Sequence, residues 1–251
     1  MKALLLLFTL LSATALAASD VAPDSLIARA EAAYLAGDHT AALDLYAATA
    51  KGGTSAGLLF NIGNCHYKLG DHSRAILFYE RALKLAPGDE DIRANLALAR
   101  THLKDRVNEL PGSTLLSEWE RMAGGRDPDH WARRSWWSFT ALFVLLALSL
   151  FISQQWPVRI LRVLAAIAAV YFLIALPMAV SRHMAVTDDS EAIIMAPKVD
   201  VRSEPRASGT ALFVVHKGTK VTVLQSVDDW SEVKLANGSI GWMSSTDLEK
   251  I

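Results

Sequence analysis

Cys65, seven histidines and a short acidic run are the residues of this 251-residue chain whose types could do chemistry. Cys65 and His66 are adjacent, and neighbouring residues of a helix point to different faces, so the pair lacks the spacing of metal ligands. His66 also stands where a helical repeat places an aromatic side chain, which favours packing in a core over ligation. The sequence therefore predicts no metal site at this pair.

The acidic run Asp188, Asp189 and Glu191 has two interpretations, a carboxylate metal site or a solvated linker. The linker is the simpler one, because a charged run between ordered segments is usually solvated. The sequence contains no Walker phosphate-binding loop and no His-Glu-x-x-His zinc motif. We therefore expect no catalytic residues, no cofactor and a non-enzymatic function.

The composition points to a membrane protein and away from nucleic acid. Hydrophobic residues make up 52% of the chain and charged residues only 20%, which is too apolar for an ordinary soluble protein. The net charge of -1 lacks the basic excess of nucleic-acid binders. Residues 1–18 read as an export signal, with Lys2 before an apolar stretch and small residues at Ala15 and Ala17. An uncleaved signal anchor is the alternative.

Two apolar stretches, 136–153 and 159–181, are each about long enough to cross a bilayer. Trp136, Trp137 and Trp156 bracket the first as interfacial anchors, and Arg162 lies near one end of the second. The connection between the stretches is too short for anything but a turn, so both flanking regions should lie on one side of the membrane. The signal favours the periplasmic side of a bacterial inner membrane, whereas the distribution of arginine is ambiguous.

An internal repeat occupies the region between the signal and these spans. Gly37-Asp38-His39 recurs as Gly70-Asp71-His72, 33 residues later, and a period near 34 with helical composition indicates a helix-turn-helix solenoid. The second copy carries the tetratricopeptide (TPR) pattern well. Its matching positions are Leu59, Ile62, Gly63, His66, Ala75, Tyr79, Ala82 and Pro87. The first copy is degenerate, and a third begins at Asp91 as a single capping helix.

The inner face of the first helices is the predicted binding surface for a peptide or helix, by the geometry of the TPR family. It would present Glu31, Tyr34, Phe60, Asn64, Tyr67, Lys68, Leu98 and His102. The alternative is that these aromatic residues pack against a helix in the linker 111–135. That linker has an apolar face of Leu115, Leu116, Trp119 and Met122, which suits either the lipid interface or an ordinary soluble linker helix.

The last sixty residues predict a small all-β barrel. Asn237-Gly238 separates two alternating segments, Val233-x-Leu235 and Ile240-x-Trp242, which is the strongest short-range signal for a hairpin with positive φ at both turn positions. Trp230 and Trp242 form a candidate ligand surface. Trp242 could equally belong to the core, because it alternates with Ile240.

This C-terminal segment resembles a bacterial SH3 domain. The resemblance rests on 199–205, on Lys217-Gly218-Thr219, on Asp229-Trp230 and on Gly241-Trp242. With the repeats, the two spans and the segment 95–100, the order of domains resembles the BatE family of the Bacteroides aerotolerance operon. That resemblance implies partners with von Willebrand A domains and a MoxR-type ATPase.

We thus expect a multidomain chain with an all-α TPR-like domain, a two-helix transmembrane hairpin and a small all-β SH3-like barrel. The predicted segments are 1–18 signal peptide, 19–110 TPR-like domain, 111–135 linker, 136–153 and 159–181 transmembrane helices, and 190–251 SH3-like domain. The predicted function is a membrane-anchored scaffold that binds other envelope proteins through its TPR groove. A cell-wall sensor that binds peptidoglycan peptides through the SH3-like domain is the alternative.

Overall fold

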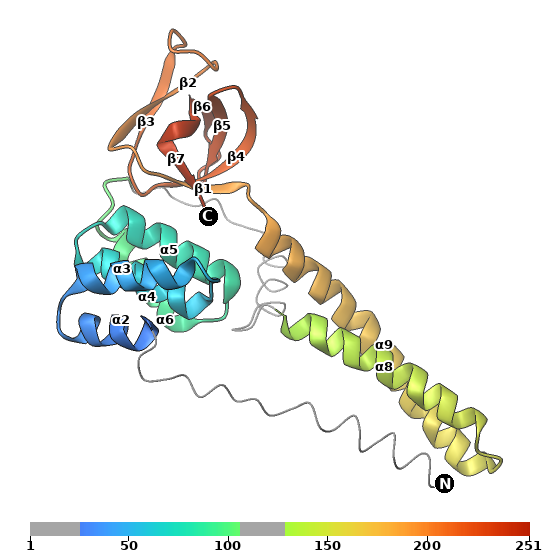
Figure 1. Ribbon diagram of the computed structural model, residues 1–251. Coiled ribbons are helices and arrows are strands. Elements are labelled where there is room, and N and C mark those ends of the chain that lie inside the picture. Colours follow the sequence, from blue (N-terminus) through green and yellow to red (C-terminus); the bar gives the residue numbers. More distant parts are fainter. Residues whose placement is uncertain (1–25, 106–128) are drawn as a thin grey trace.

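A computed structural model describes residues 26–105 and 129–251 of the chain. It contains a helical domain, a long helical hairpin and a β domain, and Figure 1 shows the hairpin extending away from the other two. The predicted signal peptide and residues 111–128 of the predicted linker lie outside the described residues.

The helical domain consists of two antiparallel helix pairs and a fifth helix. The helices are α2 Leu26–Leu35, α3 His39–Ala50, α4 Ala56–Lys68, α5 His72–Leu85 and α6 Glu90–Arg100. Asp38 and Asp71, at equivalent positions of the repeat, are the N-caps of α3 and α5, and each carboxylate accepts a hydrogen bond from a first-turn amide. Pro87 follows directly after the end of α5, since its ring cannot continue the helix. The repeat in the sequence therefore corresponds to a repeat in the structure.

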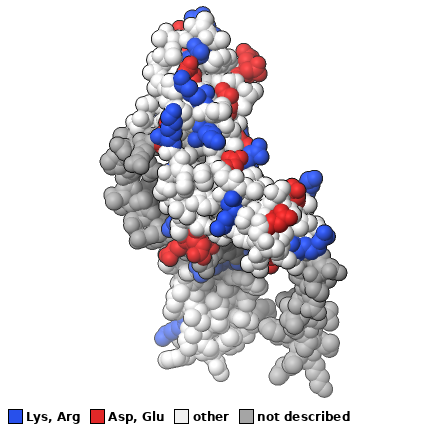
Figure 2. Space-filling model, turned by 90° about the vertical axis from the view of Figure 1, so that its left-hand side faces the viewer, with Lys and Arg blue, Asp and Glu red and all other residues white. Residues whose placement is uncertain are grey.

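The hairpin is formed by α8, His130–Leu150, and α9, Gln155–Thr187. The two helices pack together along their length, and the rings of Phe139 and Phe172 lie 5.5 Å apart. In Figure 2 charged side chains gather on the upper part of the molecule, and the lower part that is not grey shows almost none. The described residues thus include a hairpin with an apolar surface.

The expectation of two transmembrane helices is supported for one of them. Among the described residues, α9 is the one helix that is long and apolar enough to cross a membrane. The stretch predicted at 136–153 belongs to α8, whose first half carries Arg133, Arg134 and several hydroxyl residues, and these lower its hydropathy. Helix α9 also begins earlier than the predicted 159–181, because Pro157 is tolerated in a first helical turn. It also ends later, at Thr187.

The β domain is a curled, antiparallel, seven-stranded sheet with the order β3-β2-β6-β5-β4-β1-β7 (Figure 1). The strands are β1 Glu191–Ile194, β2 Lys198–Arg202, β3 Ala211–His216, β4 Lys220–Val227, β5 Trp230–Leu235, β6 Ile240–Ser244 and β7 Leu248–Lys250, with a short 3-10 helix, η1 Ser245–Asp247, before β7. Val201, Val221, Val233 and Met243 fill its core. This is the small β domain that the sequence predicts.

The predicted hairpin at Asn237-Gly238 joins β5 to β6, but with a different turn. Gly238 has φ of 88°, whereas Asn237 is not among the residues with positive φ. The Gly238 amide bonds the Leu235 carbonyl at 2.9 Å, so a type I turn is followed by one left-handed residue. The hairpin is confirmed, and the expectation of positive φ at both positions is wrong.

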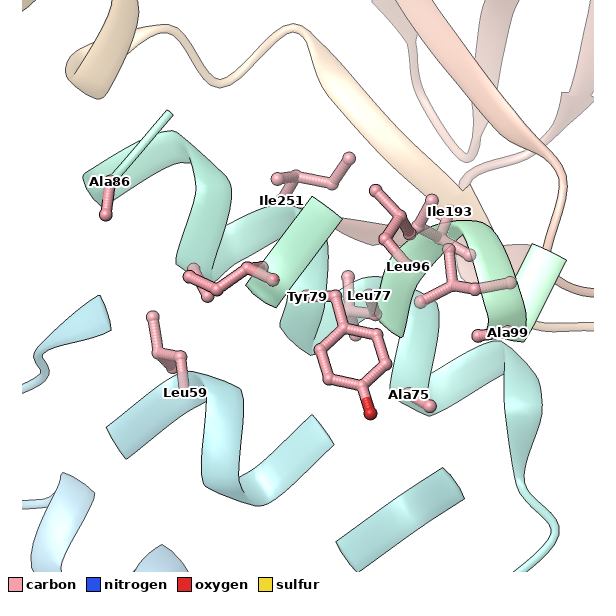
Figure 3. Close-up of a cluster of buried hydrophobic side chains, with 12 residues drawn as sticks. Leu59, Ala75, Leu77, Tyr79, Ala86, Leu96, Ala99, Ile193 and Ile251 are labelled. Atoms are coloured by element: carbon pink, nitrogen blue, oxygen red, sulfur yellow. The ribbon is translucent and has the colours of Figure 1, made fainter. Parts of the chain in front are cut away.

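The helical and β domains share one hydrophobic cluster, which the sequence did not reveal. Ile193 and Ile251 of the β domain are buried in the same cluster as Leu77, Tyr79 and Leu96 of the helical domain (Figure 3). In the next position of β1, Ile194 belongs to the core of the β domain. Because successive strand residues point to opposite faces, β1 is buried on both sides and joins the two domains.

Polar contacts border this shared cluster. Glu80 of α5 lies 2.6 Å from Arg100 and 3.1 Å from Lys220 of β4. Arg81 donates to the Lys250 carbonyl and pairs with Glu249. A solenoid of only two repeats barely encloses a core by itself. The β domain of the same chain therefore supplies cover that the short solenoid needs.

Candidate protein-binding groove

A cavity of about 250 Å³ opens on the helical domain, on the side formed by the first helices of the repeats. It is lined by Tyr34 of α2, Asn64, Tyr67 and Lys68 of α4, Tyr79 of α5, and Asn95 and Leu98 of α6. The residues from α4 are three and four positions apart and therefore share one helix face. We call this cavity the TPR groove.

A hydrogen-bonded network forms the floor of the TPR groove. The Asn64 Oδ1 atom accepts hydrogen bonds from the Tyr79 hydroxyl at 2.7 Å and from the Asn95 amide at 2.9 Å. Burial raises the pKa of Tyr79, so its hydroxyl stays protonated and donates. The network fixes the orientation of two amides, and fixed amides are suited to bind the backbone of a peptide.

Five of the eight predicted groove residues line the cavity, namely Tyr34, Asn64, Tyr67, Lys68 and Leu98. Phe60 does not, because it is half-buried with its ring 5.8 Å from that of Tyr79. His102 stacks on His72 with ring centroids 4.0 Å apart, and its Nε2 lies 3.3 Å from the Tyr67 hydroxyl. Glu31 is exposed and is not part of the lining.

Tyr79 and Asn95 line the groove although they were not predicted there. The TPR pattern assigns Tyr79 to packing, and indeed only 1% of it is exposed. Asn95 could have been predicted as a groove residue, since it lies three positions before Leu98 on the same helix face. The predicted alternative, aromatic residues packed against a linker helix, involves residues outside those described.

Cys65 and His66 are packed inside the helical domain. The His66 ring stacks on Phe78 with a centroid distance of 5.3 Å. Burial lowers the pKa of His66 and raises that of Cys65 to about 11, so both are uncharged at neutral pH. These contacts agree with the packing interpretation.

One pentapeptide, 53–57, has the Gly-x-Ser-x-Gly spacing of a serine nucleophile elbow. That motif works at a sharp turn from a strand into a helix. Here Ser55 lies between two helices and is the N-cap of α4, where its Oγ accepts a hydrogen bond from the Leu58 amide at 3.2 Å. The serine therefore stabilises a helix end.

The acidic run is engaged by lysines. Asp189 lies 3.7 Å from Lys84, and Glu191 lies 2.8 Å from Lys220. The Asp188 side chain accepts a hydrogen bond from the Ser190 amide. Asp188 and Asp189 lie between α9 and β1, as the linker interpretation expects. Glu191 is instead the first residue of β1 and is paired rather than solvated.

Trp230 and Trp242 lie on the outer face of the sheet. Glu232 pairs with Trp242 and Trp230 pairs with Ser244 across β5 and β6, so the two tryptophans are diagonal neighbours on one face. Their neighbours Val233 and Met243 point the other way into the core. Ile240, on the face of Trp242, is exposed. The interpretation of Trp242 as a core residue is wrong.

Asp105 is the hydrogen-bond acceptor that joins the end of the helical domain to the β domain. Its carboxylate accepts from the backbone amide of His216 at 2.6 Å and from the Thr219 hydroxyl at 3.0 Å, and His216 Nδ1 lies 2.7 Å away. Burial opposes ionisation of Asp105, but these hydrogen bonds outweigh it and hold its pKa below the usual value.

This contact should make the docking of the two domains sensitive to acid. Because the folded-state pKa of Asp105 is lowered, its contribution to stability is complete above the usual carboxyl pKa and is lost as pH falls below about 4. Asp105→Asn should lower stability at neutral pH by about 1–3 kcal/mol and flatten the acid dependence. Urea unfolding of the full chain in neutral detergent across pH measures both. Asp200→Asn, an exposed position of the β domain, is the control, and an unchanged acid profile in Asp105→Asn would contradict the assignment.

Comparison with known families agrees with both domains. Residues 56–89 match the tetratricopeptide repeat, and residues 197–249 match the bacterial SH3 domain. The first match covers α4 and α5, and the second runs from β2 into β7. The chain therefore contains a TPR repeat, a module for protein interaction, and a bacterial SH3 domain, a module associated with the cell wall. A comparison with curated proteins found no match.

Proposed function

We propose that this chain is a membrane-anchored, non-enzymatic scaffold that binds another cell-envelope protein in its TPR groove. The observation that carries the proposal is that one side of the solenoid is buried by the chain's own β domain, whereas the other side forms an open cavity. One side, through α5, is covered by the chain's own β domain. The groove side keeps Leu98 49% exposed beside oriented asparagines. With Tyr34 and Tyr67 in the lining, this gives the aromatic and polar mix that suits a peptide or helix.

Membrane anchoring is supported by the surface of the hairpin. Leu173 of α9 is 68% exposed and Phe143 of α8 is 54% exposed, and so many large apolar side chains would be unfavourable in water. We propose that α9 crosses the membrane and that the less apolar α8 crosses beside it, because the two helices pack together along their length. The cations Arg133 and Arg134 would then lie at the interface, beside the tryptophans that follow them.

We propose that the helical and β domains both face the periplasm of a bacterial inner membrane. The export signal predicted at 1–18 supports this orientation, and a hairpin would return the chain to its starting side. The resemblance to the BatE family supports a place in an aerotolerance or stress-related complex, with von Willebrand A-domain proteins and a MoxR-type ATPase as partners. No nucleic acid, metal or cofactor is part of the proposal.

A second candidate function is a cell-wall sensor that binds peptidoglycan peptides. Trp230 and Trp242, diagonal neighbours on the outer face of the SH3-like domain, favour it, because two large aromatic side chains on one face offer an apolar contact surface with polar N–H groups. The scaffold would use the TPR groove and the sensor would use the SH3-like domain. Variants of each surface therefore distinguish the two functions.

Site-specific cross-linking tests the scaffold. A photo-activated residue in place of Leu98 should capture an envelope protein in cells, because it would lie inside the groove. The same residue in place of Leu35, which is 86% exposed on α2 and does not line the groove, is the matched control. Combining the probe with Tyr67→Ala and Asn64→Ala should reduce capture about tenfold or more, as expected for interface anchors. The measurement is the yield of the cross-linked band identified by mass spectrometry.

Equal capture from both positions would contradict a specific groove. If capture at Leu98 fails while Trp230→Ala with Trp242→Ala abolishes retention on purified peptidoglycan, the sensor becomes the function. A third position, on the hairpin at Leu173, reports whether the chain is in the membrane by capturing lipid.

A further inference from the structure

A second cavity, of about 410 Å³, lies where α5, α6, the C-terminal part of α9 and the strands β1 and β4 meet. A volume of that size is typical of small-molecule sites. Its charged lining consists of Lys84, Arg93, Arg182 and Lys220 with Glu80 and Glu191. Four cations therefore face two carboxylates. We call it the junction cavity.

The two carboxylates of the junction cavity are already neutralised. Glu191 lies 2.8 Å from Lys220, and Glu80 lies 3.1 Å from the same lysine and 2.6 Å from Arg100. In contrast, Arg93 and Arg182 form no ion pair with any residue that the structure describes; the guanidinium of each donates to backbone carbonyls instead. The uncompensated charge of the cavity is therefore positive.

Arg182 is the strongest single indication of a ligand. Only 5% of the residue is exposed, and its Nη2 atom donates to the carbonyls of Lys84 and Leu85 at the end of α5. This capping accounts for one end of the guanidinium. The Nε atom is buried and has no hydrogen-bond partner within the described ranges, which is costly for a buried donor. An anion bound beside the guanidinium in the cavity would offset this cost through its charge.

The position of the junction cavity along α9 suggests the source of that anion. Ser181, Arg182 and Ala185 line it, and they directly follow the apolar stretch that ends near Val180. If α9 crosses a membrane, these residues lie at the depth of the lipid headgroups. Figure 1 shows this end of α9 beside the two folded domains.

We propose that the junction cavity binds a phosphate-bearing anion, either the headgroup of an acidic phospholipid or free phosphate. A guanidinium presents parallel donors that match the oxygens of a phosphate, and the two guanidiniums that lack an ion pair within the described residues, Arg93 and Arg182, come from α6 and α9. Lys84 is already paired with Asp189. Bound phosphate would link α6 to the end of α9 and so hold the helical domain against the hairpin. The lipid source rests on the membrane anchoring proposed above, whereas the phosphate chemistry does not.

The test is a titration of the full chain in neutral detergent with three probes. These are a short-chain phosphatidylglycerol, a short-chain phosphatidylcholine and inorganic phosphate. We expect the phosphatidylglycerol to bind at least about tenfold more tightly than the phosphatidylcholine. Both carry a phosphate, but the choline cation of the phosphatidylcholine is repelled by the positive charge of the cavity, whereas the phosphatidylglycerol is a net anion. Arg93→Gln should weaken binding several-fold, and Arg93→Gln with Arg182→Gln should weaken it about tenfold or more. Arg74→Gln is the control, since Arg74 lies on α5 but outside the cavity.

The probes also identify the source of the anion. Inorganic phosphate that binds as well as the phosphatidylglycerol, with the same dependence on Arg93, assigns the cavity to free phosphate. Phosphatidylglycerol binding that phosphate does not displace assigns it to lipid. Arg93 is exposed, so its variant keeps the test valid if Arg182→Gln fails to fold.

Equal affinity of the wild type and Arg93→Gln for every anion overturns the proposal. Extraction of membranes with alkaline carbonate is the separate test of anchoring, and Arg93→Gln should remain in the membrane fraction with the wild type. Release of both proteins by carbonate would refute membrane anchoring. The phosphate titration would then still test whether the junction cavity binds an anion.

Discussion

Replacing Gly63 by alanine is expected to destabilise the helical domain by about 1–3 kcal/mol, the usual cost of overpacking a core. A Cβ atom at this position would lie 2.6 Å from Cε1 and 2.7 Å from Cδ1 of Tyr79. The tyrosine ring cannot move aside easily, because it is buried and its hydroxyl is bonded to Asn64 at 2.7 Å. Gly63→Leu should be worse and should also disrupt the network in the TPR groove.

The measurement is hydrogen exchange of the full chain in neutral detergent, followed over α4 and α5. Gly57→Ala is a matched control on the same helix, since nothing lies within 4 Å of its added Cβ. Alanine is the better helix former by about 1 kcal/mol, so Gly57→Ala should be neutral or stabilising. Equal protection in the two alanine variants would show that α4 and α5 do not cross as closely as the structure indicates.

Replacing Ile193 by asparagine should uncouple the helical and β domains. None of the Ile193 side chain is exposed, and it contributes to the cluster shared with α5 and α6. Asparagine there leaves a cavity and an unsatisfied amide, at a cost of about 3 kcal/mol or more. The β domain should stay folded, because Ile194 and Ala192 fill its core from the opposite face of β1. We expect thermal unfolding in calorimetry to separate into two transitions.

Ile194→Asn is the control for this second prediction. Ile194 is equally buried, but its side chain belongs to the β core, so the variant should unfold the β domain and leave the helical transition in place. Loss of both transitions together in Ile193→Asn would mean that the helical domain cannot fold without its cover. The same single transition as in wild type would refute a shared cluster.

Local features of this chain were readable from its sequence. The repeated Gly-Asp-His segment predicts two helix starts because an aspartate cap needs only the amides of the next turn. Pro87 predicts a helix end and Asn237-Gly238 a hairpin for the same local reason, although the turn type was misjudged. The groove was partly readable, since Asn64, Tyr67 and Lys68 share a face at fixed helical spacing.

Phe60 shows where that reasoning failed. Its spacing from Tyr67 places both on one face of α4, yet whether a side chain on that face lines a cavity or packs depends on the neighbouring helix. Tyr79 of α5 lies against Phe60 and leaves Tyr67 free to line the groove. His102, which follows the end of α6, does not line the groove for a similar reason: the His72 ring of α5 stacks on it.

The sequence by itself determined the helix repeat, the apolar stretch of α9 and the β hairpins, because each depends on residues a few positions apart. Only the tertiary structure decided how the three parts meet. Glu80 and Lys220 are 140 residues apart in the chain, and Arg182 reaches the end of α5 across 97 residues. No periodicity relates such positions. Distant segments come together because folding buries the apolar surface between the domains. The junction cavity and the burial of β1 on both faces are therefore visible only in the folded structure.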